Sequence, residues 1–393
     1  MKRPTLSVVI ACLAVTCLVV TATSACAQEA RMVQVGDHQM RVRTSGLGDR
    51  EAGAPVVVLE AGFMLDGLSA WTSIFEDVAA FVPVIAYDRA GIGQSELDGV
   101  PPTPQHIVDK LHTLLGVLDA DPPYVLVGHS LGGPFIRLFA ASYPDEVAGL
   151  VYVDPTATTS AEEQADLDAA MGISAEQRRQ QLAEAPQMPT PGANAEMTLI
   201  LEQFDRNWPD FQTLPPGPDI PVTVLMSNRF QPSPSDAIER DCAPRECYAR
   251  AQEVRMAWLS KLTTEVTNGT LTVVTNSGHF IQNDDPDLVV WHIRRVVESE
   301  APVGVVDLDP SLLAEYVGVY ERSGAQFTVT LEDEQIFVQI TGQQALPAFA
   351  SSKDEFFLRV VDAQISFGRD SGGAVNQLVL HQNGRDIPWE RVR

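Results

Sequence analysis

The hydrophobic positions of the chain change their period along its length. Residues 32–44 alternate between apolar and polar side chains around Gly36-Asp37, which predicts an antiparallel hairpin. From there to about residue 298, short continuous apolar runs alternate with segments whose apolar residues recur at helical spacing. Continuous runs are typical of strands buried on both faces of a parallel sheet. The predicted buried strands are residues 55–59, 84–87, 124–127, 149–153, 220–226 and 271–275, and the predicted helices are residues 71–81, 103–118, 134–143, 249–262 and 287–298. This order predicts an α/β fold with a doubly wound, mostly parallel sheet.

Two segments depart from this alternation. Residues 155–219 are rich in Ala, Glu, Gln and Pro and contain helical stretches at 162–170 and 175–185. Residues 302–310 combine Pro, Gly and Asp as a linker does, and beyond them the apolar period becomes two. Short antiparallel strands are therefore predicted at residues 327–331, 336–340, 356–361, 364–367 and 377–381. The sequence predicts an α/β domain over residues 28–301, interrupted by an insertion, and a small antiparallel β domain over residues 311–393.

A candidate nucleophile lies in the Gly-His-Ser-Leu-Gly pentapeptide at residues 128–132. The pentapeptide follows a predicted buried strand and precedes a predicted helix, which is the context that a Gly-x-Ser-x-Gly elbow requires. Gly128 and Gly132 leave room for the crossing backbones, and Ser130 is expected to present its hydroxyl at the carboxyl end of the sheet.

These motifs, in their order, resemble the alpha/beta hydrolase family. Residues 55–62 are similar to the third strand and oxyanion turn of that family, residues 86–95 to its strand-four turn, and residues 277–280 to its histidine loop. The resemblance implies that residues 155–219 form a helical lid. The C-terminal segment resembles the small lipocalin-like β domain that follows some secreted serine hydrolases, with residues 312–320 as its opening motif.

A serine hydroxyl becomes a good nucleophile when a histidine accepts its proton and a carboxylate orients that histidine. The family places the base after the last core strand, which corresponds to His279. His129 occupies the variable position of the elbow, where adjacent side chains point apart. The acid has two candidates: Asp154 directly ends the predicted strand at 149–153, whereas Asp236 lies in a Pro-rich loop after the strand at 220–226. Asp154 has the shorter reach, although an aspartate there can also serve as a turn residue.

The oxyanion of an acyl intermediate needs two oriented backbone amides. The resemblance assigns them to Leu131, after the nucleophile, and to Phe63, in the turn after the third strand. Glu60 precedes that turn, and an unpaired carboxylate near a developing oxyanion would oppose catalysis. Two interpretations remain open: Glu60 pairs with Arg89 of the neighbouring turn, or it braces the amides of its own loop.

Composition and charge limit the partners. The 393 residues carry a net charge of −25, which disfavours nucleic acid as a partner because phosphates would be repelled. The spacing of Cys and His does not indicate a metal site, and the glycines at 91 and 93 lack the remainder of a dinucleotide fingerprint. We therefore expect no cofactor.

Residues 1–27 have the features of a signal peptide. Lys2 and Arg3 precede an apolar run at 6–20, and Ala25-Cys26-Ala27 suits cleavage after residue 27. We expect a secreted or periplasmic protein, and membrane attachment only in the alternative that Cys26 is lipidated. Cys242 and Cys247 form an even pair in an exported chain, which predicts a local disulfide; two free thiols are the alternative.

The leading hypothesis is a secreted serine hydrolase that acts on a small carboxylic ester through an acyl-enzyme on Ser130. A proline-type aminopeptidase and a thioesterase of the same fold remain open, because the elbow determines the chemistry but not the acyl partner. A binding protein that has kept the fold without catalysis is the alternative from another class. The sequence of the lid segment contains no motif that names the substrate.

Overall fold

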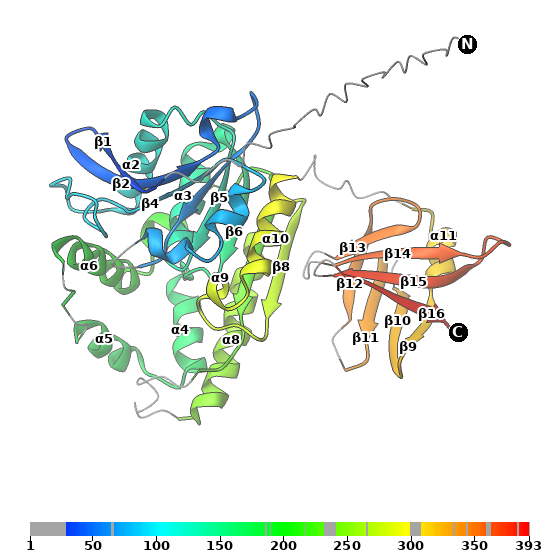
Figure 1. Cartoon of the computed structure of the whole chain (residues 1–393). Coiled ribbons are helices and arrows are strands. Elements are labelled where there is room, and N and C mark those ends of the chain that lie inside the picture. The colour runs from blue at the N-terminus through cyan, green and yellow to red at the C-terminus, as the bar shows by residue number, and fades with distance from the viewer. Residues whose placement is uncertain are drawn as a thin grey trace, which may run out of the picture.

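The protein is described by a computed structural model of the chain. It describes residues 29–393 except 64–66, 185–186, 189, 216, 232–240, 265, 299–307, 333–334, 343–344, 359–362, 383–384 and 393. The predicted signal peptide and most of the predicted linker at 302–310 lie outside the described residues. Two bodies are present, an α/β body and an antiparallel β body (Figure 1).

The α/β body is built on an eight-stranded sheet in the order β1-β2-β4-β3-β5-β6-β7-β8. Its strands are Arg31–Val35, His38–Ser45, Val56–Glu60, Val84–Tyr87, Tyr124–His129, Val147–Val153, Val222–Ser227 and Gly269–Val274, numbered β1 to β8. β1 and β2 pair antiparallel, β2 pairs antiparallel with β4, and every other pairing is parallel. The predicted mostly parallel sheet is confirmed, and the carboxyl ends of β3, β5, β6, β7 and β8 therefore meet at one edge.

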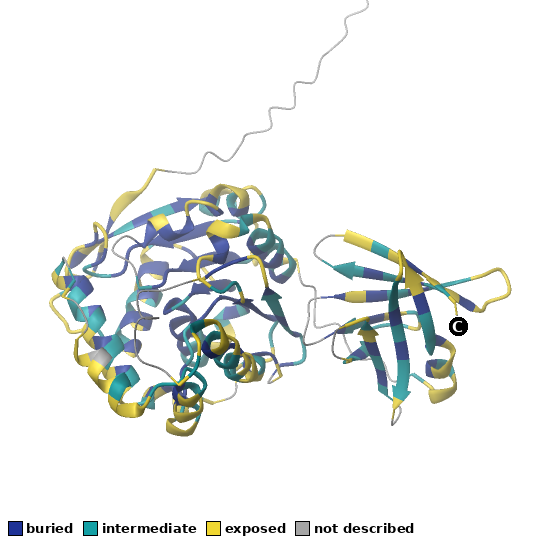
Figure 2. Ribbon diagram, turned by 90° about the horizontal axis from the view of Figure 1, so that it is seen from below, coloured by how far each residue is buried: buried dark blue, intermediate teal, exposed yellow. Residues whose placement is uncertain are grey.

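Helices cover both faces of this sheet, as the continuous apolar strands predict. In β3, Val56 and Val58 belong to one core and Val57 and Leu59 to the other. The first core includes residues of α2 (Pro104–Val117), α3 (Gly132–Ser142) and α8 (Pro244–Thr264), and the second includes residues of α1 (Phe75–Ala79) and α10 (Pro286–Val297). The buried residues form a continuous layer along the strands, whereas exposed residues lie on the outer helices (Figure 2).

The helix predicted at 71–81 is shorter than its pattern suggested. A 3-10 turn, Leu68–Trp71, and a five-residue helix, α1, take its place. Trp71 is fully buried and belongs to the turn, so the apolar spacing reflected burial of a loop as well as of a helix.

The described residues of the insertion form four helices, of which two were predicted. α4 (Ala161–Ala170) and α5 (Ala175–Ala183) match the predicted stretches, and α4 begins with a capping box between Ser160 and Glu163. α6 (Pro191–Asp205) and α7 (Pro209–Gln212) were not predicted. The start of α6 did carry a signal, because Thr190 caps the helix and Pro191 is its first residue.

The C-terminal body is a closed eight-stranded antiparallel barrel preceded by α11 (Pro310–Tyr316). Its strands β9 to β16 are Gly318–Arg322, Ala325–Glu332, Gln335–Ile340, Leu346–Ala350, Glu355–Leu358, Gln364–Arg369, Val375–Gln382 and Arg385–Arg391. Aromatic rings pack against one another in its core: Phe356 lies 5.5 Å from Phe367 and Phe327 lies 5.5 Å from Trp389, between ring centroids. A barrel of eight strands is about wide enough for side chains to fill its interior.

The barrel contains strands that the alternation did not reveal. β9, β12 and β16 were not predicted, and the last two each contain a proline, Pro347 or Pro388, which weakens a strand pattern. Both prolines nevertheless occupy paired positions, opposite Phe337 and Val379. The antiparallel β domain is confirmed, with more strands than predicted.

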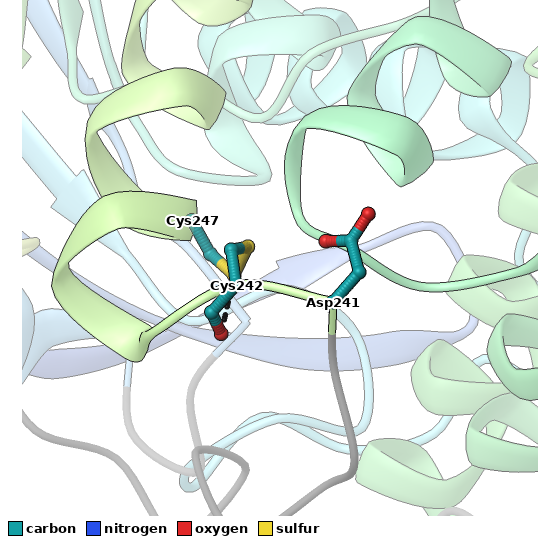
Figure 3. A group of neighbouring side chains, drawn as sticks. All are labelled: Asp241, Cys242 and Cys247. Atoms are coloured by element: carbon teal, nitrogen blue, oxygen red, sulfur yellow. Dashed lines mark hydrogen bonds between the residues drawn. A yellow bond between two sulfur atoms is a disulfide. The ribbon is translucent and has the colours of Figure 1, made fainter.

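The predicted disulfide joins Cys242 to Cys247 at the start of α8 (Figure 3). Cys247 is fully buried, and neighbouring Asp241 forms an ion pair with Arg250 at 3.1 Å. The bridge therefore holds the chain entering α8 against the first turn of that helix.

The two bodies have separate hydrophobic clusters, so we expect the α/β body to fold alone. A chain ending near residue 305 keeps the whole sheet and its covering helices. The truncated protein is expected to be soluble and to show a cooperative thermal transition. An aggregated or non-cooperative truncated protein would mean that the two cores stabilise each other.

Candidate active site

Ser130 lies in a sharp turn between β5 and α3. Its φ is +50°, in the left-handed region that is strained for a residue with a side chain. Its amide donates to the carbonyl of Val153 at 3.1 Å. Gly132 permits the turn, because a Cβ at that position would lie 2.3 Å from the carbonyl oxygen of Glu60. These contacts hold the strained serine between β3 and β6, as the elbow motif predicts.

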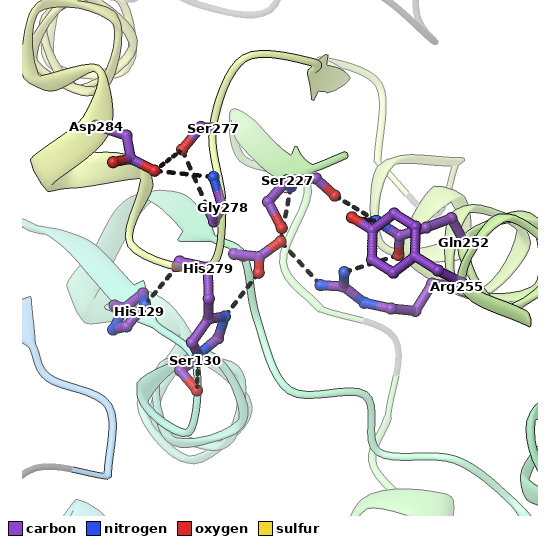
Figure 4. Close-up of polar contacts among 11 residues, drawn as sticks. His129, Ser130, Ser227, Gln252, Arg255, Ser277, Gly278, His279 and Asp284 are labelled. Carbon is purple, nitrogen blue, oxygen red and sulfur yellow. Dashed lines mark hydrogen bonds and ion pairs between the residues drawn. The ribbon is translucent and has the colours of Figure 1, made fainter. Parts of the chain in front are cut away.

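The structure brings Ser130, His279 and Asp154 together. Nε2 of His279 lies 2.9 Å from Oγ of Ser130, and Nδ1 lies 2.7 Å from Oδ2 of Asp154 (Figure 4). The carboxylate can only accept, so Nδ1 carries the proton and Nε2 accepts from the serine hydroxyl. Asp154 ends β6 and His279 follows β8, at the edge where the parallel strands end. The alternative acid, Asp236, lies in residues 232–240, outside the described residues.

Asp154 is buried and held by more than the histidine. Its Oδ1 accepts from the amide of Ser227 at 2.7 Å and from Nη2 of Arg255, on α8, at 2.9 Å. Burial opposes ionisation of this carboxyl, but the hydrogen bond to His279 and the charge of Arg255 outweigh it and lower the pKa of Asp154 to about 2. The carboxylate is therefore charged throughout the neutral range. Sequence reasoning missed Arg255, because a single arginine in a polar helix carries no local signal.

His129 points away from the serine hydroxyl and contacts the histidine loop. Its Nε2 lies 2.9 Å from the carbonyl oxygen of His279, which can only accept, so Nε2 donates. Burial, with a smaller contribution from the charge of His279, lowers the pKa of His129 to about 4, which keeps it neutral. Its Nδ1 has no hydrogen-bond partner among the described residues. His129 thus braces the backbone of His279, a contact that its place in the elbow did not reveal.

The two predicted oxyanion residues flank the elbow. Leu131 is the N-cap of α3, and Phe63 lies in the turn after β3. That turn passes close to Ser130, since a Cβ placed on Gly62 would lie 3.0 Å from the Cβ of Ser130. Glu60 pairs with Arg89 at 2.6 Å. The first of the two interpretations of Glu60 is therefore correct.

A cavity of about 430 Å³ opens beside His279. Apolar side chains, Leu167 and Phe204, come from the insertion, and Arg229 and Arg255 come from the sheet edge and α8. Among the described lining residues, the only carboxylate is that of Asp154, which is already paired with His279 and Arg255. The described lining thus combines apolar side chains, neutral polar ones such as Gln164 and Tyr248, and two guanidinium groups that are already paired, Arg229 with Asp284 and Arg255 with Asp154.

A second Ser-His-Asp chain of hydrogen bonds lies on the barrel. Oγ of Ser366 lies 2.8 Å from Nε2 of His381, whose Nδ1 lies 2.7 Å from Oδ1 of Asp386. Ser366 sits in β14 with its backbone paired to β13 and β15, and the Asp386 side chain is 77% exposed. These residues lack the strained turn that presents Ser130, so they serve as an internal comparison for it.

The fold and this arrangement agree with a match to a known protein family. A family model described as "Alpha/beta hydrolase family" matches residues 57–290, and one described as "Domain of unknown function (DUF3471)" matches residues 304–391. The first match covers more than half of the chain, which therefore belongs to the alpha/beta hydrolase family.

Individual relatives are more distant. The chain is 33% identical over 99 residues to the uncharacterized protein YqjL of Bacillus subtilis. The aligned region covers 25% of this chain and 39% of that protein. It is 29% identical over 92 residues to the human (lyso)-N-acylphosphatidylethanolamine lipase, covering 23% of the chain and 27% of the lipase. The chain thus spans less than two thirds of the length of these curated relatives.

Solved structures align with the chain at low identity. An esterase from Thermogutta terrifontis is 21% identical, with a TM-score of 0.44 over 69% of this chain and 100% of that one. An enol-lactonase from Burkholderia xenovorans LB400 is 16% identical, with a TM-score of 0.47 over 68% of this chain and 100% of that one.

The ion pair between Arg255 and Asp154 gives a prediction for stability against pH. The folded pKa of Asp154 is lowered, so the stability that the pair contributes is present above about pH 4, the unfolded value, and is lost as pH falls towards 2. Arg255→Met is expected to lower the free energy of unfolding by about 1 to 3 kcal/mol at pH 7.

Urea denaturation at pH 7, 5, 4 and 3 would measure this loss, which should shrink only below pH 4. Arg250→Met is the matched control, since Arg250 lies on the same helix and pairs with Asp241, whose side chain is 69% exposed. An equal loss in both variants, or one that is constant with pH, would contradict the role of the pair.

Proposed function

We propose that the protein is a serine hydrolase that cleaves a small carboxylic ester. The observation that carries the proposal is the hydrogen-bonded chain from Ser130 through His279 to Asp154 at a strained elbow. This geometry is suited to nucleophilic catalysis, because the base lies within hydrogen-bond reach of the hydroxyl and the acid orients the base.

Each residue then has a defined step. Nε2 of His279 takes the proton as Oγ of Ser130 attacks the ester carbonyl, and Asp154 stabilises the imidazolium that forms. The amides of Phe63 and Leu131 donate to the oxyanion. His279 passes the proton to the departing alcohol, leaving an acyl group on Ser130. Water then attacks this acyl-enzyme with His279 again as base, which releases the acid and restores the serine.

The cavity supports an ester in preference to a peptide with a free amino terminus. An aminopeptidase needs an anionic group for the substrate ammonium, whereas the single carboxylate of the described lining, that of Asp154, is already paired with His279 and Arg255. The cavity volume of about 430 Å³ suits a small acyl or alcohol group. A thioester would use the same steps, so a substrate screen must include it.

We also propose that the protein works outside the cytoplasm. The disulfide between Cys242 and Cys247 supports an oxidising compartment. Among the helices that the structure describes, none is long and apolar enough to cross a membrane. Detection of the mature chain with an amino terminus at Gln28 in a periplasmic or culture fraction would support export by cleavage, and a lipid on Cys26 would support the anchored alternative.

The nucleophile is tested by labelling and turnover together. Ser130→Ala is expected to lose p-nitrophenyl ester hydrolysis by about 10³-fold or more and to lose fluorophosphonate labelling. Ser366→Ala is the matched control, because it removes the serine of the other Ser-His-Asp chain, and it should keep both properties. Labelling that survives in Ser130→Ala and disappears in Ser366→Ala would overturn the assignment.

A screen of graded p-nitrophenyl esters, thioesters and aminoacyl anilides would define the acyl partner.

The acid is tested by replacing each candidate with its amide. Asp154→Asn is expected to lower kcat by about 10³ to 10⁴, because an amide favours the wrong tautomer of His279, while Asp236→Asn should lower it less than about tenfold. Circular dichroism would check that both variants fold. The reverse ranking would assign the acid to Asp236.

A further inference from the structure

Arg89 lies at the centre of a buried cluster of charges behind the oxyanion turn. Its Nη1 donates to Oε1 of Glu60 at 2.6 Å and to the carbonyl oxygen of Ala61 at 2.7 Å, and its Nη2 donates to the carbonyl oxygen of Gly62 at 2.8 Å. The Arg89 side chain is 6% exposed and that of Glu60 is 1% exposed. One guanidinium thus holds a side chain and two successive backbone carbonyls of the turn.

The bond to Gly62 has a direct consequence for the oxyanion hole. The carbonyl of Gly62 and the amide of Phe63 belong to the same peptide unit, which is planar and trans, so they point in opposite directions. Because Arg89 fixes the carbonyl on the buried side, the Phe63 amide is directed to the other side of the turn. The charged donor also polarises this peptide unit, which makes its N–H a stronger donor.

The lid supplies the other partner of the same guanidinium. Glu196, on α6, accepts from Nε of Arg89 at 2.7 Å through Oε1 and from Nη2 at 2.9 Å through Oε2. Its side chain is 4% exposed. A paired, planar contact of this kind fixes the orientation of the arginine as well as its position. The orientation of Arg89 therefore depends on the lid helix.

A backbone contact holds α6 at the same place. Gly192, in the first turn of α6, packs against Gly91 in the turn after β4, and a Cβ on Gly192 would lie 1.9 Å from the carbonyl oxygen of Gly91. The sequence separation between Arg89 and Glu196 is 107 residues, so only the docked helix brings them together.

The charges of the cluster are unequal, with two carboxylates beside one arginine. Burial raises the pKa of Glu60, against the opposing charge of Arg89, and the hydroxyl of Tyr87 donates to the second oxygen of Glu60. If Glu196 were withdrawn, Glu60 would be the remaining carboxylate beside the buried Arg89. The paired contact with Glu196, which now fixes the plane of the guanidinium, would be lost.

We propose that Glu196 is a positioning residue, through which the docked lid helix holds the oxyanion turn in its catalytic conformation. Closure of the lid and formation of the oxyanion hole are then one event, and an undocked α6 leaves the Phe63 amide misdirected. This inference rests on the proposed function, because it concerns the oxyanion of that reaction.

The test compares Glu196→Gln with Glu202→Gln. Glu202 lies on the same helix and is exposed, so its variant should match the wild type. Glu196→Gln keeps the size of the side chain and loses its charge and one acceptor. We expect kcat to fall about 10- to 100-fold with KM changed less than threefold, because the oxyanion forms only after substrate has bound. The affinity for a boronic acid, which forms a tetrahedral adduct on Ser130, should fall by a similar factor, whereas affinity for the product carboxylate should not.

The outcomes separate this inference from the proposed function. A wild-type enzyme that fluorophosphonate does not label would reject the function itself. A labelled wild type with an unchanged kcat and boronate affinity in folded Glu196→Gln would overturn the inference alone. A loss of kcat with unchanged boronate affinity would also overturn the inference, because the substitution would then act on a step other than stabilisation of the oxyanion. If Glu196→Gln does not fold, Glu196→Asp retains the charge but is too short for both contacts, and the same two measurements are expected to fall.

Discussion

The close contact between the elbow and β3 is the constraint on which the site depends. Gly132 lies directly against the backbone of Glu60, and this contact sets the depth at which the elbow meets the neighbouring strand. A larger residue would separate β3 from the start of α3 and move the oxyanion turn away from Ser130. The strain at Ser130, with its positive φ, persists because strands on both sides fix the turn. Packing of the sheet therefore stabilises a conformation that the chain would not adopt alone.

A second layer of interactions fixes the charged groups around that turn. Two residues of the hydrogen-bonded chain, Ser130 and Asp154, have positive φ values, and both lie immediately after parallel strands. Arginines from elsewhere in the chain hold the groups beside them: Arg255 holds Asp154, and Arg89 holds the turn that carries Phe63. The acidic protein thus places two of its 27 Lys and Arg residues where they organise carboxylates and carbonyls.

Sequence reasoning predicted the features that leave a local signature. The continuous apolar run before Ser130 and the pentapeptide itself predicted the strand, turn and helix, and the motif order led to His279. The contacts of Arg255, Glu196 and His129 could not be predicted, because each joins segments far apart in sequence and depends on how helices dock. The strands β12 and β16 were not predicted, and both contain a proline that nevertheless occupies a paired position in the closed barrel. The choice of Asp154 rested on strand order, and the observed adjacency of β5 and β6 explains why a residue at that position reaches His279.

The hydrogen-bonded chain on the barrel has a wider consequence for how such sites are recognised. Ser366, His381 and Asp386 satisfy the same distances as the residues at the elbow, within about a tenth of an ångström. A geometric template built from side-chain atoms alone would return both sets from this one chain. The backbone φ angle of the serine distinguishes the two sets. Ser130 has a φ in the left-handed region, whereas Ser366 lies in a β-strand. Templates that include the φ angle would discard hydrogen-bonded sets of serine, histidine and aspartate side chains that lie on neighbouring strands of a sheet. Proteins rich in β-structure can form such sets wherever these three residues are neighbours on one face.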